Sequence, residues 1–238
     1  MMHFTFIHIA LFVITGLAYC QNNENEAALR ENEAGAQVQL LTIKPIIQNL
    51  KSPSAAHRIT AIGFLSRMGP VATEAIDPLI ICLKDKSTQV RIEAIAALVS
   101  IDEYGKKTIP ALIPFLSSKQ SILRITSIKA LANWYEDSAP ALPALLKCLK
   151  SKDSDERELT LITIGKMEKA ALKTKASIIA ACSDKENSVR LQAIIALTAV
   201  APKDKDSMAI FTKALKDKNT DVVKAAKDAL KVKKSKTD

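Results

Sequence analysis

The sequence is poor in the residues from which catalytic and metal sites are built. Its 238 residues include three histidines, four cysteines and six glycines. Only His57 lies beyond the first 20 residues, and no second histidine or cysteine cluster completes a zinc site. No glycine-rich phosphate loop and no nucleophile motif occurs. We therefore predict a protein without metal, cofactor or catalytic residues, and not an enzyme.

Long apolar runs are also lacking, with one exception at the N-terminus. Residues 1–20 contain no Lys, Arg, Asp or Glu, and residues 4–19 are mostly apolar. This run is shorter and more interrupted than the ~20 apolar residues of a membrane-spanning helix. It predicts a signal peptide over residues 1–20, cleaved after Ala18 or Cys20. The mature protein would then be exported, either to a periplasm or out of the cell.

Attachment of a lipid after cleavage is the alternative interpretation of the same segment. Leu17, Ala18 and Cys20 resemble a bacterial lipobox, in which the cysteine is acylated after cleavage. Tyr19 stands where that motif has a small residue. The sequence therefore favours plain secretion over a membrane tether at Cys20, and an uncleaved anchor is a third, minor alternative.

Acidic and basic residues are separated at the two ends of the chain. Residues 21–36 carry four Glu against Arg30, which predicts a polar linker. Residues 203–238 hold eleven Lys and six Asp, or +5 of the chain's net +9, and end in a basic tail at 235–238. Such charge would suit anionic lipid, acidic polysaccharide or nucleic acid. A solubilising cap is the simpler interpretation, because the last unit of a repeat array faces water.

What the sequence does have is a strict internal period. Five arginines recur at intervals of 33 residues, namely Arg58, Arg91, Arg124, Arg157 and Arg190. A fixed period of this length is typical of a helix pair copied head to tail, and stacked copies form a solenoid. Six copies fit residues 37–234 without an insertion. We predict an all-α, right-handed α-solenoid of about six 33-residue helix pairs.

Each unit has the apolar spacing of two helices separated by a polar turn. In residues 70–102, apolar side chains recur at helical intervals in two stripes around Ile80 and Ile95. Three cysteines take or adjoin the closing apolar position of a first helix: Cys82, Cys148 and Cys182. A free thiol serves there as a small apolar side chain, so we expect three buried, unpaired cysteines.

These units resemble a known repeat. The strings 68–80 and 83–98 resemble the HEAT repeat, in the short form found in phycobilisome lyases and in many bacterial repeat proteins. The resemblance covers residues 37–234. It implies an armadillo-like helical array whose second helices line a concave surface that binds other proteins.

The resemblance also implies a ladder of ion pairs along the array. In that family an aspartate in the inter-helix turn bonds the arginine of a neighbouring unit. Ser52, Ser118 and Ser151 replace this aspartate, so we predict a partial ladder. Its predicted members are Arg58, Asp85, Arg91, Arg124, Arg157, Asp184 and Arg190. In the alternative interpretation, the arginine column lines a groove that binds an anionic ligand.

The outward positions of the second helices are the candidate partner contacts. They are Thr60, Arg67, Glu93, Thr126, Asn133, Lys166 and Gln192. These side chains are mixed in charge and suit a protein partner. Trp134 joins them as the only tryptophan of a chain with 4% aromatic residues. Exposed, it would be a binding hot spot; buried, it would fill the gap before Ala139 and Pro140.

Together these features predict an exported scaffold that binds an unidentified protein and catalyses nothing. One alternative, implied by the resemblance, is a lyase or chaperone-like protein related to phycobilisome lyases. Another is a HEAT protein that binds nucleic acid or a different anionic polymer. Export and the position of the basic residues in the terminal cap count against nucleic acid, so we expect no specific nucleic-acid partner.

Overall fold

The computed structural model describes residues 43–231. The predicted signal peptide at 1–20, the linker at 21–36 and the tail at 235–238 lie outside the described residues. The chain divides into two compact units, Met1–Gln48 and Asn49–Asp238. Of the first unit only residues 43–48 are described, and they are helical. Within 43–231 every regular element is a helix and no strand is formed, as predicted.

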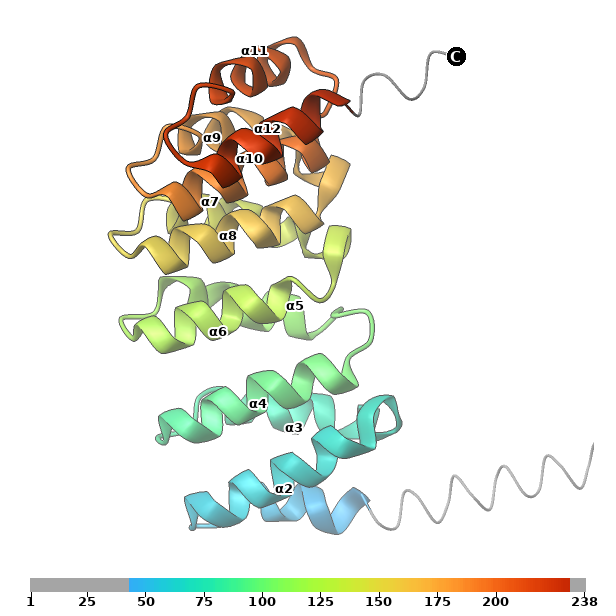
Figure 1. Cartoon of the computed structure of the whole chain (residues 1–238). Helices are drawn as coiled ribbons and strands as arrows, with labels where there is room; N and C mark the ends of the chain where they lie inside the picture. The colour runs from blue at the N-terminus through green and yellow to red at the C-terminus, as the bar shows by residue number, and fades with distance from the viewer. Residues whose placement is uncertain (1–42, 232–238) are drawn as a thin grey trace, which may run out of the picture. The chain divides into compact units, whose positions relative to one another are not determined.

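The second unit is a stack of helix pairs. Its second helices are α2 (Ala55–Met68), α4 (Thr88–Ile101), α6 (Ser121–Leu131), α8 (Ser154–Lys166), α10 (Asn187–Val200) and α12 (Thr220–Lys231). Its first helices are α3 (Ile76–Cys82), α5 (Thr108–Leu112), α7 (Leu142–Cys148), α9 (Lys175–Ala181) and α11 (Lys205–Ala214). Figure 1 shows the second helices side by side in one layer, with the first helices in the layer behind them.

Three short 3-10 helices join successive units and follow the period of 33, namely η1 (Gly69–Ala75), η3 (Tyr135–Ala141) and η4 (Glu168–Thr174). A fourth, η2 (Ile113–Ser117), lies within one unit, between α5 and α6. Gly69 begins η1 with φ of 58°. Tyr135 and Glu168 lie two and three periods later, and they also have positive φ, 45° and 46°. Each of these three 3-10 helices therefore begins at a residue with positive φ.

Polar side chains fix the starts of the second helices. Ser54 precedes α2 and accepts a hydrogen bond from the backbone N–H of His57. Ser87 caps α4 in the same way, and Asp153 caps α8 through the N–H of Asp155. Such caps satisfy N–H groups that have no partner within the helix.

Two columns of residues spaced 33 apart in the second helices lie in the core. The large apolar column is at most 1% exposed and consists of Ile62, Ile95, Ile128, Leu161 and Ile194. The neighbouring column of small residues is at most 3% exposed and consists of Ala61, Ala94, Ser127, Thr160, Ala193 and Ala226. Small residues let adjacent helices approach closely. At Gly165 of α8 an added Cβ would lie 3.1 Å from the Cα of Ala196 in α10.

The last helix pair changes from apolar to polar where the stack ends. Lys227 of α12 occupies the large apolar column and is exposed, as is Lys224 three residues earlier. The predicted polar cap is therefore formed by α12. None of the helices in the described part of the chain combines the length and the apolar character needed to cross a membrane.

Candidate functional site

The arginine column begins each second helix and is bonded first to its own unit. In every one of the five arginines, Nη1 donates to the backbone carbonyl six residues earlier, over 2.6–3.0 Å. For Arg157 this carbonyl belongs to Ser151, at 2.9 Å. The guanidinium thus closes the turn between the two helices of its unit.

The remaining nitrogens reach the next unit. Arg58 Nε lies 2.7 Å from Asp85 Oδ2. Arg157 and Arg190 each hold the aspartate 27 residues ahead, Asp184 and Asp217, through two hydrogen bonds of 2.8–2.9 Å. Bidentate pairs of this kind are strong and directional. The pairs link neighbouring units, as the resemblance to HEAT repeats implied.

The ladder of ion pairs is interrupted at Arg91, in line with the prediction of a partial ladder, although every arginine of the column bonds a side chain of the next unit. Where Ser118 replaces the turn aspartate, Arg91 Nη2 donates instead to Gln120 Oε1 at 2.9 Å. Where Ser151 replaces it, Arg124 is held by Glu156 at 2.8–3.0 Å. Side chains two and five residues beyond the turn position supply the missing acceptors.

The ion pairs shift the pKa values of the arginine and aspartate side chains that form them. Hydrogen bonding to Asp184 raises the pKa of Arg157 above its usual value. Burial by itself would raise the pKa of Asp184, but the hydrogen bonds from Arg157 and from the backbone N–H of Glu186, together with the positive charges nearby, outweigh it, and the pKa of this carboxyl is lowered. The side chains of the pair are only 7% and 15% exposed. The Arg157 guanidinium therefore links two neighbouring units, and its charge is paired with a carboxylate instead of being free for an anionic ligand.

The predicted contact residues lie on the layer of second helices, which we call the second-helix face. Thr60, Arg67, Asn133 and Lys166 are exposed, whereas Glu93, Thr126 and Gln192 are half-buried. Both threonines donate to the carbonyl four residues earlier in their own helix. Glu93 accepts a hydrogen bond of 2.6 Å from Gln89 Nε2. The face thus offers short polar groups partly satisfied within their own helices.

Trp134 does not belong to that face, and its assignment as a partner contact was wrong. The side chain is 4% exposed, and Nε1 donates to the carbonyl of Asp102 at 2.7 Å. Its ring lies against Gly105, where an added Cβ would be 2.8 Å from the indole carbons Cγ and Cδ2. Trp134 therefore joins the third unit to the turn that precedes it.

Two exposed aromatic residues lie next to the predicted contacts and were not among them. Tyr135 is 59% exposed and Phe64 is 48% exposed. Each carries a cation over its ring, Lys166 Nζ at 5.7 Å from Tyr135 and Arg67 Cζ at 4.7 Å from Phe64. The sequence does mark Tyr135 as unusual, because it lies two periods after Gly69, at a position where a bulky residue is not expected.

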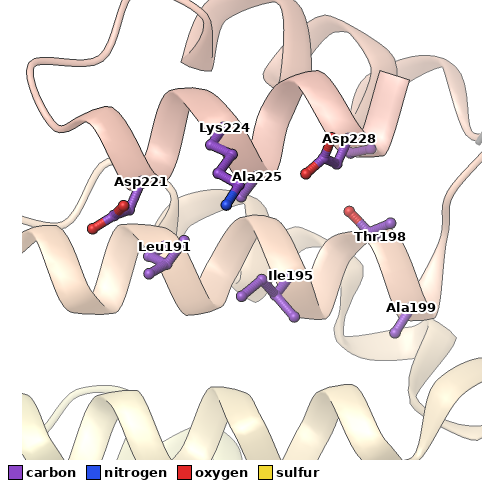
Figure 2. Close-up of a pocket in the computed structure, with 9 residues that line it drawn as sticks. Leu191, Ile195, Thr198, Ala199, Asp221, Lys224, Ala225 and Asp228 are labelled. Atoms are coloured by element: carbon purple, nitrogen blue, oxygen red, sulfur yellow. The ribbon is translucent and has the colours of Figure 1, made fainter. Parts of the chain in front are cut away.

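A hollow of the face lies between α10 and α12. It encloses about 580 Å³, and Leu191, Ile195 and Ala199 of α10 form one side of it. On α12, Ala225 and Ala229 face them, and Figure 2 shows Asp221, Lys224 and Asp228 spaced along the same helix. We call this hollow the terminal groove. Ile195 within it is 48% exposed.

A small residue opens the terminal groove. Ala225 occupies a helical position held in earlier units by larger side chains, namely Thr60, Glu93, Thr126, Leu159 and Gln192. The alanine leaves Leu191 and Ile195 of the preceding helix uncovered. This decrease in size along one column was the signal in the sequence that could have located the groove.

The three described cysteines are free thiols at the ends of first helices. Cys82 and Cys148 are buried, and Cys148 Sγ donates to the carbonyl of Leu116 at 3.5 Å. Cys182 is half-buried, so the prediction of burial is only partly correct there. Burial raises the pKa of Cys148 to about 11 and that of Cys182 to about 12. High thiol pKa values favour the neutral, unreactive form.

The repeated helix pair and its ladder correspond to a defined family. The sequence pattern of HEAT repeats matches residues 43–132, 76–165 and 142–231, which together span most of the chain. The chain belongs to the HEAT-repeat family. No curated protein sequence matches this HEAT-repeat protein.

Solved structures of similar architecture agree with this assignment. A designed armadillo repeat protein in complex with the peptide (KR)4 has 18% identity and a TM-score of 0.62, covering 79% of this chain and 97% of that one. The complex of CpcE and CpcF of phycocyanin lyase from Nostoc sp. has 20% identity and a TM-score of 0.56, covering 79% and 75%. At such low identity these HEAT- and armadillo-type structures support the fold alone.

Proposed function

We propose that this HEAT-repeat protein is an exported, non-catalytic scaffold that binds a partner protein along its second-helix face. The observation that carries the proposal is the half-exposed apolar side chain of Ile195 in the terminal groove of that face. Exposed apolar groups in a hollow rimmed by polar residues mark binding surfaces. The ladder arginines are bonded to their own repeats, so the face offers mixed polar groups instead of a band of unpaired cations.

The similar structures are compatible with this role. One designed armadillo protein of the same architecture holds a peptide, and another was designed for modular peptide recognition. A solenoid presents a long, rigid surface, and a rigid surface binds without the cost of ordering flexible segments. An extended or helical segment of a protein partner therefore fits the second-helix face better than a small substrate.

Site-specific photocrosslinking tests the docking face. A photoreactive phenylalanine analogue at Thr60 or Gln192 should give a discrete protein adduct in cells, because both positions lie on the second-helix face. The same analogue at Ile81 of α3, which is 72% exposed on the first-helix layer, is the matched control and should give none. Adducts from Ile81 alone, or from none of the three positions, would overturn the proposed function.

Export is the second part of the proposal, and it rests on residues 1–20 of the sequence. We expect the mature protein to begin after Ala18 or Cys20, without lipid. Intact mass of the protein from the exported fraction measures this directly. A mass increased by acyl chains at Cys20 would instead show a membrane-tethered lipoprotein. Protein that retains residues 1–20 and stays in the cytoplasm would contradict export.

A further inference from the structure

The terminal groove carries a pattern of charge along α12. Asp221, Lys224 and Asp228 follow one another at intervals of three and four residues, so they share one side of the helix. The two carboxylates are about 10.5 Å apart along the helix axis, two turns at 1.5 Å per residue. All three residues line the groove and all three are exposed.

We propose that the terminal groove binds an amphipathic α-helix of a partner protein, whose edge carries a basic, an acidic and a second basic residue in that order. The inference rests on the proposed function and names the chemistry of the partner. The basic residues would meet Asp221 and Asp228, and the acidic residue would meet Lys224. Apolar side chains of the same helix would cover Leu191 and Ile195.

The groove has acceptors available for such an edge. Asp221 makes no ion pair within residues 43–231, and its backbone N–H donates a hydrogen bond to Asn219 Oδ1. Asp228 is paired with Lys231 at 2.9 Å, but both side chains are more than half exposed. Exposed pairs are weak and exchange readily. A partner cation can therefore replace Lys231 at little cost.

The spacing selects a helix over an extended peptide. On a helical partner, residues seven apart also lie about 10.5 Å apart on one face, with a residue between them one turn from each. On a strand, the same distance spans about three residues, which point to opposite sides. A helix therefore pairs with all three charges of α12 at once, while its apolar side chains fill the groove. This is the helix-in-groove mode of peptide recognition.

Two other occupants fit less well. A second copy of α12 packed antiparallel in the register that aligns all three charges would place Asp221 against Asp228 and Lys224 against Lys224, which repel, and a register shifted by one turn would leave Asp228 outside the paired charges. The chain's own tail, residues 232–238, is basic but has Val232 as its only apolar residue. It cannot cover the apolar side of the groove. A separate amphipathic helix supplies both the charges and the apolar surface.

Synthetic peptides test the proposal on the full chain. One capped helical peptide carries leucines on one face and arginine, glutamate and arginine along its edge. Its matched control exchanges these three residues for glutamate, arginine and glutamate. We expect fluorescence anisotropy to show binding of the first peptide, and binding of the control weaker by about tenfold, the effect of three reversed ion pairs at the surface.

Variants assign the binding to the groove. Ala225→Leu fills the groove and should weaken binding by about tenfold or more, a loss of about 1.4 kcal/mol. Ala96→Leu, at an exposed alanine of α4 on the same face, should leave it unchanged. The double variant Asp221→Lys with Asp228→Lys should lose the first peptide and gain the control peptide. Circular dichroism melts verify that each variant is folded.

Several results would overturn the inference. They are equal affinity for both peptides, binding that Ala225→Leu does not weaken, and dimerisation through α12 in sedimentation experiments. A chain truncated after Lys231 that binds much more tightly would assign the groove to its own tail. Adducts at Thr60 or Gln192 without peptide binding would overturn this inference and leave the proposed function standing. Groove-dependent binding without any adduct would support the groove and overturn the broader docking face.

Discussion

Replacing Arg157 with leucine should lower the free energy of unfolding by about 3–5 kcal/mol, the cost of breaking a buried ion pair from one side. The Arg157 side chain is 7% exposed and holds both carboxylate oxygens of Asp184 as well as the carbonyl of Ser151. Its removal leaves a nearly buried carboxylate without a counter-charge, held by the backbone N–H of Glu186 alone. Urea denaturation followed by circular dichroism measures the loss.

The double variant Arg157→Leu with Asp184→Leu separates the ion pair from packing. It should recover a large part of the stability, because no unpaired charge remains. If it is no more stable than Arg157→Leu alone, the loss comes from packing and the ladder is not the cause.

The Arg157–Asp184 pair also makes the free energy of unfolding depend on pH. The pKa of Asp184 is lowered in the folded protein, so its stabilising contribution is present above the unfolded value of about 3.9 and is lost as the pH falls through the lower folded pKa. In Arg157→Leu, protonation neutralises the Asp184 carboxylate that has lost its arginine and so removes the cost of burying this charge. The difference in stability between wild type and variant should therefore narrow on acidification below about pH 4.

The period of the sequence predicts those parts of the fold that repeat. The arginines and the apolar columns recur at fixed intervals, and the structure places them in the ladder and in the core. Gln120 and Glu156 lie off the aspartate column, so a comparison at fixed spacing could not find them. They act as acceptors because stacking brings the start of one second helix beside the preceding arginine, and this contact exists only in three dimensions.

The candidate site depends on residues that break the period. Trp134 and Tyr135 are adjacent in sequence, yet one is buried and the other is exposed, because the chain turns through positive φ at Tyr135. The terminal groove arises where Ala225 is smaller than its counterparts and so exposes Ile195 of the neighbouring helix. Such a hollow requires the distance between two helices as well as the residue types, and periodicity supplies only the latter.

Replacing Gly105 with alanine should lower the free energy of unfolding by about 3 kcal/mol, combining backbone strain with overpacking. Gly105 has φ of 62°, and an added Cβ would lie 2.7 Å from Ile109 Cδ1 and 2.8 Å from two indole carbons of Trp134. The alanine would push the ring away from the carbonyl of Asp102, which Nε1 contacts at 2.7 Å. Because Trp134 is the chain's only tryptophan, its emission should shift to longer wavelength in the variant.

Two further glycines separate the causes of this loss. Gly63→Ala, inside α2 with its nearest atom at 3.9 Å and no positive φ, should stabilise the protein by about 0.5–1 kcal/mol, because alanine favours a helix. Gly69→Ala, with φ of 58° and its nearest atom at 3.7 Å, should show strain without overlap and leave the emission unchanged. Suppose that Gly105→Ala lowers the free energy of unfolding no more than Gly69→Ala does and leaves the tryptophan emission unchanged. Contact between residue 105 and the indole ring would then contribute nothing to stability.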